Sequence, residues 1–463
     1  MIRRLDKVTA SAVYLAAATV LTSLVGLLFW GVAARSKQAS VHTVHTLAFG
    51  HAYAEISALT LLSIIAQFNL TNIFVRFLPS AGSLGTHFVR RGYIAVTTTA
   101  LALGAIFVLS PLSSKIIPAG AFAAVLFVVA VALFAIFALQ DSVLTALRIT
   151  HWVPLENTTF SVAKLGLLAW FMVVMPLRSA IVLAWILPVI VAVILVNWLL
   201  FSKALPRHAQ SGTGVLPRRR RLLTFVAAEY LTTLSSVASS MALPLVVIWK
   251  AGAASEAYFA VPWLVALTIM NLFWNINASY TVETVSADAH SARRLRRTLE
   301  MWIGLVVVSL VICTLLGPTI LGLLGPEYRR HGGALLQVIG LSTPFSMVTI
   351  VYQAYAWLDR RVWVLLANSV LRAVVLLSLS IALLSGMGIV GVAWAYLIAQ
   401  AAAALLMTPS VWRQTRRILK SDAPIALARD KEPPTGAAPP HRRPPSPTAP
   451  PLDVGPRASR RRA

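Results

Sequence analysis

The stretch FAAVLFVVAVALFAIFAL, residues 122–139, decides the fold because none of its side chains is charged or forms hydrogen bonds. A helix needs about 20 apolar residues to cross the hydrocarbon core of a bilayer. The whole chain has this character: 58% of its residues are hydrophobic and only 12% are charged, about half the charged fraction of a soluble protein. In lipid, each backbone amide must find its partner within its own segment, which favours helices. The sequence therefore predicts an all-α polytopic membrane protein.

Similar apolar runs on both sides of this stretch predict about 12 transmembrane helices. The first run follows three basic residues as a signal peptide does, but it is longer than a signal core and further spans follow, so we expect a retained helix. The predicted spans lie near residues 9–34, 50–74, 92–112, 119–147, 153–175, 178–201, 222–248, 257–284, 298–324, 333–357, 362–384 and 387–411.

The basic residues predict the orientation of these helices. Lys and Arg number 40 against 15 acidic residues, a net charge of +25. Such a charge can indicate nucleic acid binding, but the hydrophobic fraction favours a membrane, and we expect no nucleic acid partner. Lys and Arg accumulate in cytoplasmic loops. When both termini are placed in the cytoplasm, most basic residues before Lys420 fall in inner segments. The chain is therefore expected to be a multi-pass membrane protein with both termini cytoplasmic.

A basic loop divides the predicted helices into two blocks of six. We expect an N-terminal six-helix lobe over 1–202, a cytoplasmic linker over 203–221 that contains RRRR at 218–221, and a C-terminal lobe over 222–420. Asn69 in IAQFNL and Asn275 in NLFWNI take corresponding places in the two lobes. Because both lobes enter from the cytoplasm, this predicts a parallel pseudo-repeat.

The composition changes after Lys420. Residues 421–463 are rich in Pro and Arg and lack apolar periodicity. Such a composition cannot bury a core, so we expect a disordered cytoplasmic tail.

No pattern of residues typical of an enzyme occurs. The chain has no clustered acids for a metal-bound nucleotide, no Walker loop and no HExxH motif. His42, His45 and His51 have spacings that could bring imidazoles together, but without a nearby carboxylate or thiolate a solvated loop is favoured over a metal site. We therefore expect no enzyme activity, no metal and no cofactor.

Charged residues inside the predicted spans are the default functional candidates because they are costly in lipid. Lys164 and Arg372 lie at similar depths in the fifth and eleventh helices and would suit an anionic head group. The alternatives are that each extends toward the interface or pairs with an acid. Glu229 and Asp141 are candidates for binding a coupling proton or sodium ion, or for internal pairing. Glu55 lies near an interface, where solvation is favoured.

Amide side chains form polar stripes in the second and eighth predicted helices. Asn69 and Asn72 lie on the former, and Asn271 and Asn275 on the latter. Spacings of three and four return to one helical face. These amides would line a cavity and bind sugar hydroxyls, or they would hold helices together.

Four motifs, in this order and spacing, resemble those of a polysaccharide flippase of the multidrug/oligosaccharidyl-lipid/polysaccharide exporter superfamily. They are GLLFWGVAAR at 26–35, FVRFLP at 74–79, LLGPEY at 323–328 and GIVGVAWAYLIAQ at 388–400. The resemblance implies two six-helix lobes in a V around a central cavity, lined mainly by helices 1, 2, 7 and 8. It also implies movement of undecaprenyl-pyrophosphate-linked glycans to the outer leaflet of a bacterial plasma membrane by alternating access.

The resemblance also bears on individual residues. It supports Asn69, Asn275 and Glu229 as cavity positions and weakens Lys164 and Arg372, because helices 5 and 11 are more peripheral in such folds. Helices 1 and 7 of this chain carry no arginine, unlike those of related lipid-II flippases. A pyrophosphate would then depend on Arg76 at the inner mouth, or on Lys164 and Arg372.

The expected function is therefore that of a membrane transporter that flips a polyprenyl-pyrophosphate-linked oligosaccharide for cell-surface polysaccharide biosynthesis. Its expected partners are the lipid bilayer, the glycan, and glycosyltransferases or a polymerase of the same pathway. Two alternatives remain: a cation-coupled drug or metabolite exporter of the same fold, and a non-transporting partner in a glycan-assembly complex.

Overall fold

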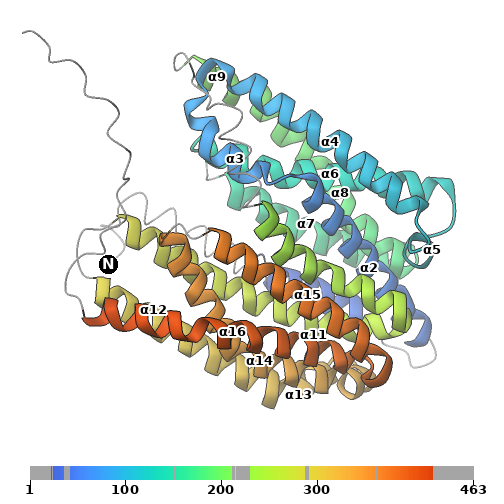
Figure 1. Ribbon diagram of the computed structural model, residues 1–463. Coiled ribbons are helices and arrows are strands. Elements are labelled where there is room, and N and C mark those ends of the chain that lie inside the picture. The colour runs from blue at the N-terminus through green and yellow to red at the C-terminus, as the bar shows by residue number, and fades with distance from the viewer. Residues whose placement is uncertain are drawn as a thin grey trace, which may run out of the picture. The chain divides into compact units, whose positions relative to one another are not determined.

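The computed structural model describes residues 22, 24–35, 42–149, 152–210, 214, 230–286, 291–359 and 362–420. These residues form helices and connecting turns, with no β-strand among them (Figure 1). All of them belong to one compact unit. The predicted tail, the RRRR run and Glu229 lie outside the described residues.

The N-terminal half comprises the helices that precede residue 211. The first described helix is Leu24–Ala34. The other elements are α2 (His42–Ala66), α3 (Leu70–Phe77), η2 (Leu78–Ser80), η3 (Gly82–Leu84), α4 (Gly85–Leu109), α5 (Ser113–Ile116), α6 (Ala121–Ala146), α7 (Trp152–Val174), α8 (Leu177–Leu199), η4 (Leu200–Ala204) and α9 (Leu205–Ala209).

The C-terminal half comprises the helices that follow residue 229. They are η5 (Leu234–Ala238), α11 (Ser239–Ser286), α12 (Ser291–Leu310), η6 (Val311–Leu316), α13 (Gly317–Gly322), α14 (Pro326–Leu358), α15 (Val362–Met387) and α16 (Ile389–Lys420). Of these, α14 and α15 both pack on α16.

Among the described residues, 10 helices are long and apolar enough to cross a membrane. One of them, α11, has 48 residues, about 72 Å of helix and more than twice the hydrocarbon thickness. Its backbone leaves the helical region at Gly252, where φ is 82° and ψ is 174°. Glycine adopts such a positive φ without a steric penalty. We therefore divide α11 into two spans, before and after Gly252. The helix Leu24–Ala34 lies within the first predicted span, but its described part is shorter than a membrane crossing. The number of about 12 spans therefore stays a prediction.

Several predicted boundaries differ from the structure. The second span begins at His42 instead of near residue 50, so His45 and His51 lie on a helix and not in a loop; the His51 ring is 2.8 Å from the Leu47 carbonyl oxygen. Within the predicted linker over 203–221, η4 and α9 keep the chain helical through Ala209.

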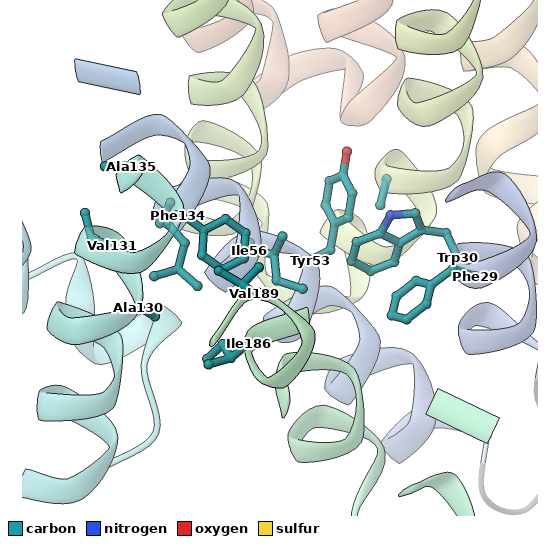
Figure 2. Packing of buried hydrophobic residues seen from close by; sticks show 14 of the residues in the cluster. Phe29, Trp30, Tyr53, Ile56, Ala130, Val131, Phe134, Ala135, Ile186 and Val189 are labelled. Carbon is teal, nitrogen blue, oxygen red and sulfur yellow. The ribbon is translucent and has the colours of Figure 1, made fainter. Parts of the chain in front are cut away.

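Aromatic side chains fill the core of the N-terminal half. The ring of Trp30 lies 4.9 Å from Tyr53 and 5.3 Å from Phe29, in both cases edge to face (Figure 2). Aromatic pairs prefer this arrangement because the positive edge of one ring meets the negative face of the other. Trp185 of α8 packs on the same group of rings, 6.0 Å from Trp30. The first helix, α2 and α8 are held together in this way.

The main contact between the two halves runs along α2 and α11 (Figure 1). A Cβ atom on Gly50 of α2 would stand 1.9 Å from the carbonyl oxygen of Ala253 in α11. Small residues allow this close approach of two backbones, as in other membrane helix pairs. With the predicted orientation, Gly50 and Ala253 lie at the outer ends of their helices. The structure therefore joins the second and eighth spans, the two that the amide pattern singled out.

Candidate functional site

A cavity of about 260 Å³, with several polar side chains in a largely apolar wall, lies inside the C-terminal half, between η5, α11, α14, α15 and α16. Arg372 of α15 and Asn271 of α11 both line it, so the structure brings together two residues that the sequence singled out. Its other polar lining residues are Ser239, Ser240, Thr349, Gln353, Tyr396 and Gln400.

The sequence of α15 explains why Arg372 faces this cavity. Asn368, Leu376 and Ser380 are buried, and with Arg372 they repeat every four residues along one face of the helix. The other side of α15 carries apolar residues that are exposed, among them Val370 and Val374. An arginine placed on that side would meet lipid, where a charge is costly.

Arg372 forms no hydrogen bond or ion pair with any residue that the structure describes, and none of the residues that line the cavity is acidic. An unpaired charge away from water is unfavourable unless a counter-ion or hydrogen-bond acceptor reaches it. The Oε1 atom of Gln353, another lining residue, is also buried without a partner. The cavity therefore has a positive charge and amide groups, which suits an anion that carries hydroxyl groups.

The opening of the cavity lies on α11. Asn271 and Trp274, one helical turn apart, both line the cavity and are exposed. Trp263 Nε1 donates to the carbonyl oxygen of Ser240 at 3.2 Å and so ties together the two spans of α11 beside the cavity. Since α11 is the helix that packs on α2, a movement between the halves would also affect this opening.

The N-terminal amides lie at a break in the second span and do not line this cavity. Phe68 and Asn69 have positive φ angles of 46° and 57°, between the end of α2 and the start of α3. Asn72 Nδ2 donates to Asn69 Oδ1 at 2.9 Å, while Asn69 Nδ2 is buried without a partner. Non-helical backbone at membrane depth is tolerated where it lies in protein or lines a water-filled cavity.

Lys164 lies in a cage of aromatic rings instead. Its side chain is buried, and Nζ is 4.3 Å from the ring centroid of Trp185, 5.0 Å from Phe160 and 5.6 Å from Phe29. The negative faces of aromatic rings attract an ammonium group, by about 2 kcal/mol or more when it is desolvated. Lys164 does not line the Arg372 cavity. The cage gives a structural reason for a cation at this depth.

The remaining predicted residues are dispersed. Arg76 is exposed on α3, with its guanidinium 5.6 Å from the Phe77 ring centroid. Asn275 is half-buried, and its Nδ2 atom is buried without a partner. Neither residue lines the Arg372 cavity. Glu55 is not solvated as expected: it is buried and accepts a hydrogen bond from Arg178 at 3.1 Å.

Two further acids, which the sequence did not single out, are buried in the structure. Glu156 and Glu256 are 7% and 0% exposed, and neither has a hydrogen-bond partner on its carboxyl oxygens. Glu156 lies near Asp141, with which it interacts electrostatically; Asp141 Oδ2 accepts from Asn157 Nδ2 at 3.0 Å. Glu256 lies on α11 between Ala253 and Ala257. Both acids occur near the ends of predicted spans, where a carboxylate is usually expected to be hydrated. The one local sign of burial was Asn157, an amide next to Glu156 that can bond to a buried carboxylate.

No group of three or more His, Cys, Asp or Glu side chains suited to a metal ion occurs within the described part of the chain.

No protein-family model and no curated protein matches the sequence. Several solved structures match the fold. The lipid II flippase MurJ in an inward closed conformation has a TM-score of 0.60 at 12% identity, covering 87% of this chain and 89% of that chain. A multidrug resistance MATE family transporter of the MOP superfamily, in its inward-facing conformation, has a TM-score of 0.58 at 15% identity, covering 91% and 98%.

A third match is a MOP superfamily transporter from Pyrococcus furiosus Vc1, described as having a binding pocket of reverse polarity. Its TM-score is 0.55 at 12% identity, and it covers 89% of this chain and 96% of that chain. At these identities the likeness concerns the fold. The expected all-α polytopic fold is thereby confirmed, and it is similar to the fold of these transporters.

Proposed function

We propose that this protein is a membrane transporter that flips a polyprenyl-pyrophosphate-linked oligosaccharide from the inner to the outer leaflet of a bacterial plasma membrane. The observation that carries this proposal is Arg372, which lines a cavity within the spans and has no ion pair with any described residue. The guanidinium would bind the diphosphate, for which its fork of N–H donors is suited. Asn271 and the other amides would bind sugar hydroxyls. The similar structures of a lipid II flippase and of MATE transporters support the class of activity.

The charge of the cavity favours this substrate over an organic cation. Among the residues that the structure describes, Arg372 alone brings a charge to the lining, and a drug that carries a positive charge would be repelled in a low-dielectric site. Export of a cationic drug is therefore the second candidate. For one protein similar in fold, a binding pocket of reverse polarity is described as suggesting a different function. The sign of the charge in the Arg372 cavity would therefore separate anionic from cationic substrates.

Alternating access would act through the contact between α2 and α11. Gly50 and Ala253 are in backbone contact, which closes the path between these helices at that level. Tyr230 donates to the carbonyl oxygen of Ile65 at 2.8 Å and adds a second contact between the halves. Opening to the outer side would require α2 and α11 to separate near Gly50. Apart from this separation, each half would move as one packed unit.

Coupling to a proton or sodium gradient would use the Asp141–Glu156 pair. Two close carboxyl groups without a described basic partner take up a proton or cation favourably. If this pair couples transport, the double variant Asp141→Asn/Glu156→Gln should move substrate without responding to an imposed gradient. An unchanged gradient response would remove the pair as the coupling site. The role of Glu229 remains a prediction.

The proposed function is tested with the full-length protein in proteoliposomes. Labelled polyprenyl-pyrophosphate oligosaccharide is supplied on one side, and its exposure on the other is followed with a membrane-impermeant lectin. We expect transport by the unmodified protein and a loss of about tenfold or more in Arg372→Gln, since removing one partner of a desolvated charge pair is costly. Arg413→Gln, an exposed arginine of α16 outside the cavity, is the matched control.

Each outcome decides between the candidates. Failure of the unmodified protein to expose the glycan would contradict the flippase proposal and favour the non-transporting partner. Transport of an organic cation, unaffected by Arg372→Gln, would favour the exporter. Equal losses in Arg372→Gln and Arg413→Gln would remove Arg372 from substrate binding.

A further inference from the structure

A second cavity, of about 440 Å³, lies at the end of α8 in the N-terminal half and is separate from the Arg372 cavity. With the orientation predicted from the sequence, this is the inner end. Three of its lining residues are basic: Lys203, Arg207 and His208. The others include Trp152 and the aliphatic residues Leu147 and Leu199. We call these six residues the inner basic pocket. None of its described lining residues is a carboxylate, and none of the functional residues discussed above belongs to it.

The basic wall of the pocket arises because α8 does not end with its apolar run. The chain continues through the π-helical turn η4 into α9. Proline inside a helix breaks the hydrogen-bond ladder, and the widened turn before Pro206 lets the chain remain helical. Leu200 and Leu205 are buried, while Lys203 and Arg207, four residues apart, are exposed. Both cations therefore extend from one side of the helix.

His208 fixes this wall against the rest of the N-terminal half. Its Nε2 atom lies 3.0 Å from the carbonyl oxygen of Leu78. A Cβ atom on Gly85, at the start of α4, would come within 3.2 Å of the His208 ring. The pocket is therefore formed before any ligand arrives, so a ligand need not order the helix that carries Lys203 and Arg207.

The other wall is apolar and lies at the turn between α6 and α7. Leu147 and Trp152 border this turn, and Arg148 within it is exposed and has a φ of 59°. Tryptophan is enriched where the bilayer meets water, at the level of the lipid headgroups. Lys203 Nζ lies 5.2 Å from the ring centroid of Trp198, a second exposed tryptophan. The two tryptophans place the pocket at headgroup level.

A continuous apolar surface leads from the pocket toward the bilayer core. Ile194, Leu195 and Trp198 of α8 are each about 60% exposed and precede the lining residue Leu199. These side chains would contact lipid tails in a membrane. The pocket therefore combines basic groups at headgroup level with an exposed apolar surface directly below them.

We propose that the inner basic pocket binds one anionic phospholipid, with its phosphate on Lys203 and Arg207 and its acyl chains along α8. Basic pockets between transmembrane helices on the cytoplasmic side are typical sites for anionic headgroups. A bound lipid would lie between the α8–α9 segment, which holds its phosphate, and the apolar wall at the α6–α7 turn. This lipid is a resident ligand and not the transported substrate, so the inference is independent of the proposed function.

Native mass spectrometry of the purified full-length protein tests this proposal. Phosphatidylglycerol or phosphatidylcholine is added, and the bound lipids are counted at each concentration. We expect one phosphatidylglycerol to bind in preference to phosphatidylcholine. The double variant Lys203→Ala/Arg207→Ala should weaken that binding by about 30-fold, the effect of removing two basic residues near a headgroup. Arg207→Ala alone should weaken it by about fivefold and serves if the double variant does not fold.

Two controls make the result specific. Arg413→Ala/Arg416→Ala removes two exposed cations from the inner end of α16, where Arg416 also lies beside a tryptophan, 4.2 Å from the Trp412 ring centroid. This control should retain the lipid. An equal loss in both double variants would show general attraction of acidic lipid and would overturn the site. Displacement of the lipid by an equal concentration of inorganic phosphate would assign the pocket to free phosphate and would also overturn it.

Discussion

Arg372 and Lys164 are both cations near the middle of apolar helices, but their surroundings differ. Arg372 lies half-buried in a cavity that also has amide and hydroxyl groups, with no described ion partner, whereas Lys164 is buried against three aromatic rings. Aromatic faces compensate for the desolvation of an ammonium group within the protein itself. An arginine without such compensation remains available for a ligand. The two residues therefore have different expected roles despite their similar depth.

Replacing Lys164 tests this difference at the level of one side chain. We expect Lys164→Met to retain transport within about twofold, because methionine fills a similar volume and contacts aromatic rings favourably. Arg372→Met should lose transport as Arg372→Gln does. Initial transport rates in proteoliposomes, normalised to folded protein, provide the measurement. A loss of transport in Lys164→Met with unchanged thermal stability would support substrate binding by Lys164.

The break between α2 and α3 is the clearest departure from regular helix among the described elements. Phe68 and Asn69 are consecutive non-glycine residues with positive φ. Such a backbone costs roughly 1–2 kcal/mol per residue, and asparagine tolerates it better than most residues. The Asn72–Asn69 hydrogen bond offsets part of that cost. The local sequence thus stabilises a turn where the hydropathy pattern predicts uninterrupted helix.

Substitutions at Asn69 should separate backbone strain from side-chain bonding. Asn69→Ala loses both the hydrogen bond and the tolerance for positive φ, and we expect a destabilisation of about 1–2 kcal/mol. Asn69→Gly loses the hydrogen bond but relieves the strain, so it should be less destabilising than alanine. Thermal unfolding in detergent measures both variants. A greater loss of stability for glycine than for alanine would contradict the assigned conformation.

For the whole molecule, the contact of Gly50 with Ala253 determines how closely the halves approach. A larger residue would place its Cβ atom 1.9 Å from a backbone oxygen, which only a displacement of α2 from α11 can relieve. Glu256 lies on the adjoining turn of α11, fully buried and without a hydrogen-bond partner on its carboxyl oxygens. Separation of the halves would expose this acid to water.

We therefore expect Gly50→Val to prevent closure of the α2–α11 contact and to abolish transport while the protein still folds. Thr46 of α2 is only 3% exposed, so labelling of a cysteine at this position, in a background without Cys313, should rise several-fold when the contact opens. Gly166→Val is the matched control, because Gly166 is a helical glycine with no atom within 4 Å of its Cβ position. Normal transport by Gly50→Val would show that this contact does not participate in the cycle.

The sequence alone determined that the chain is an all-α membrane protein, because the solvation cost of unpaired backbone groups in lipid leaves few structures for long apolar runs. It also identified Arg372 and Asn271 as costly polar residues within spans. Only the tertiary structure decided which candidates share a cavity. Side-chain direction and neighbours distinguish the cavity around Arg372 from the aromatic cage around Lys164. The burial of Glu156 and Glu256 likewise depends on residues distant in sequence, which helical spacing cannot reveal.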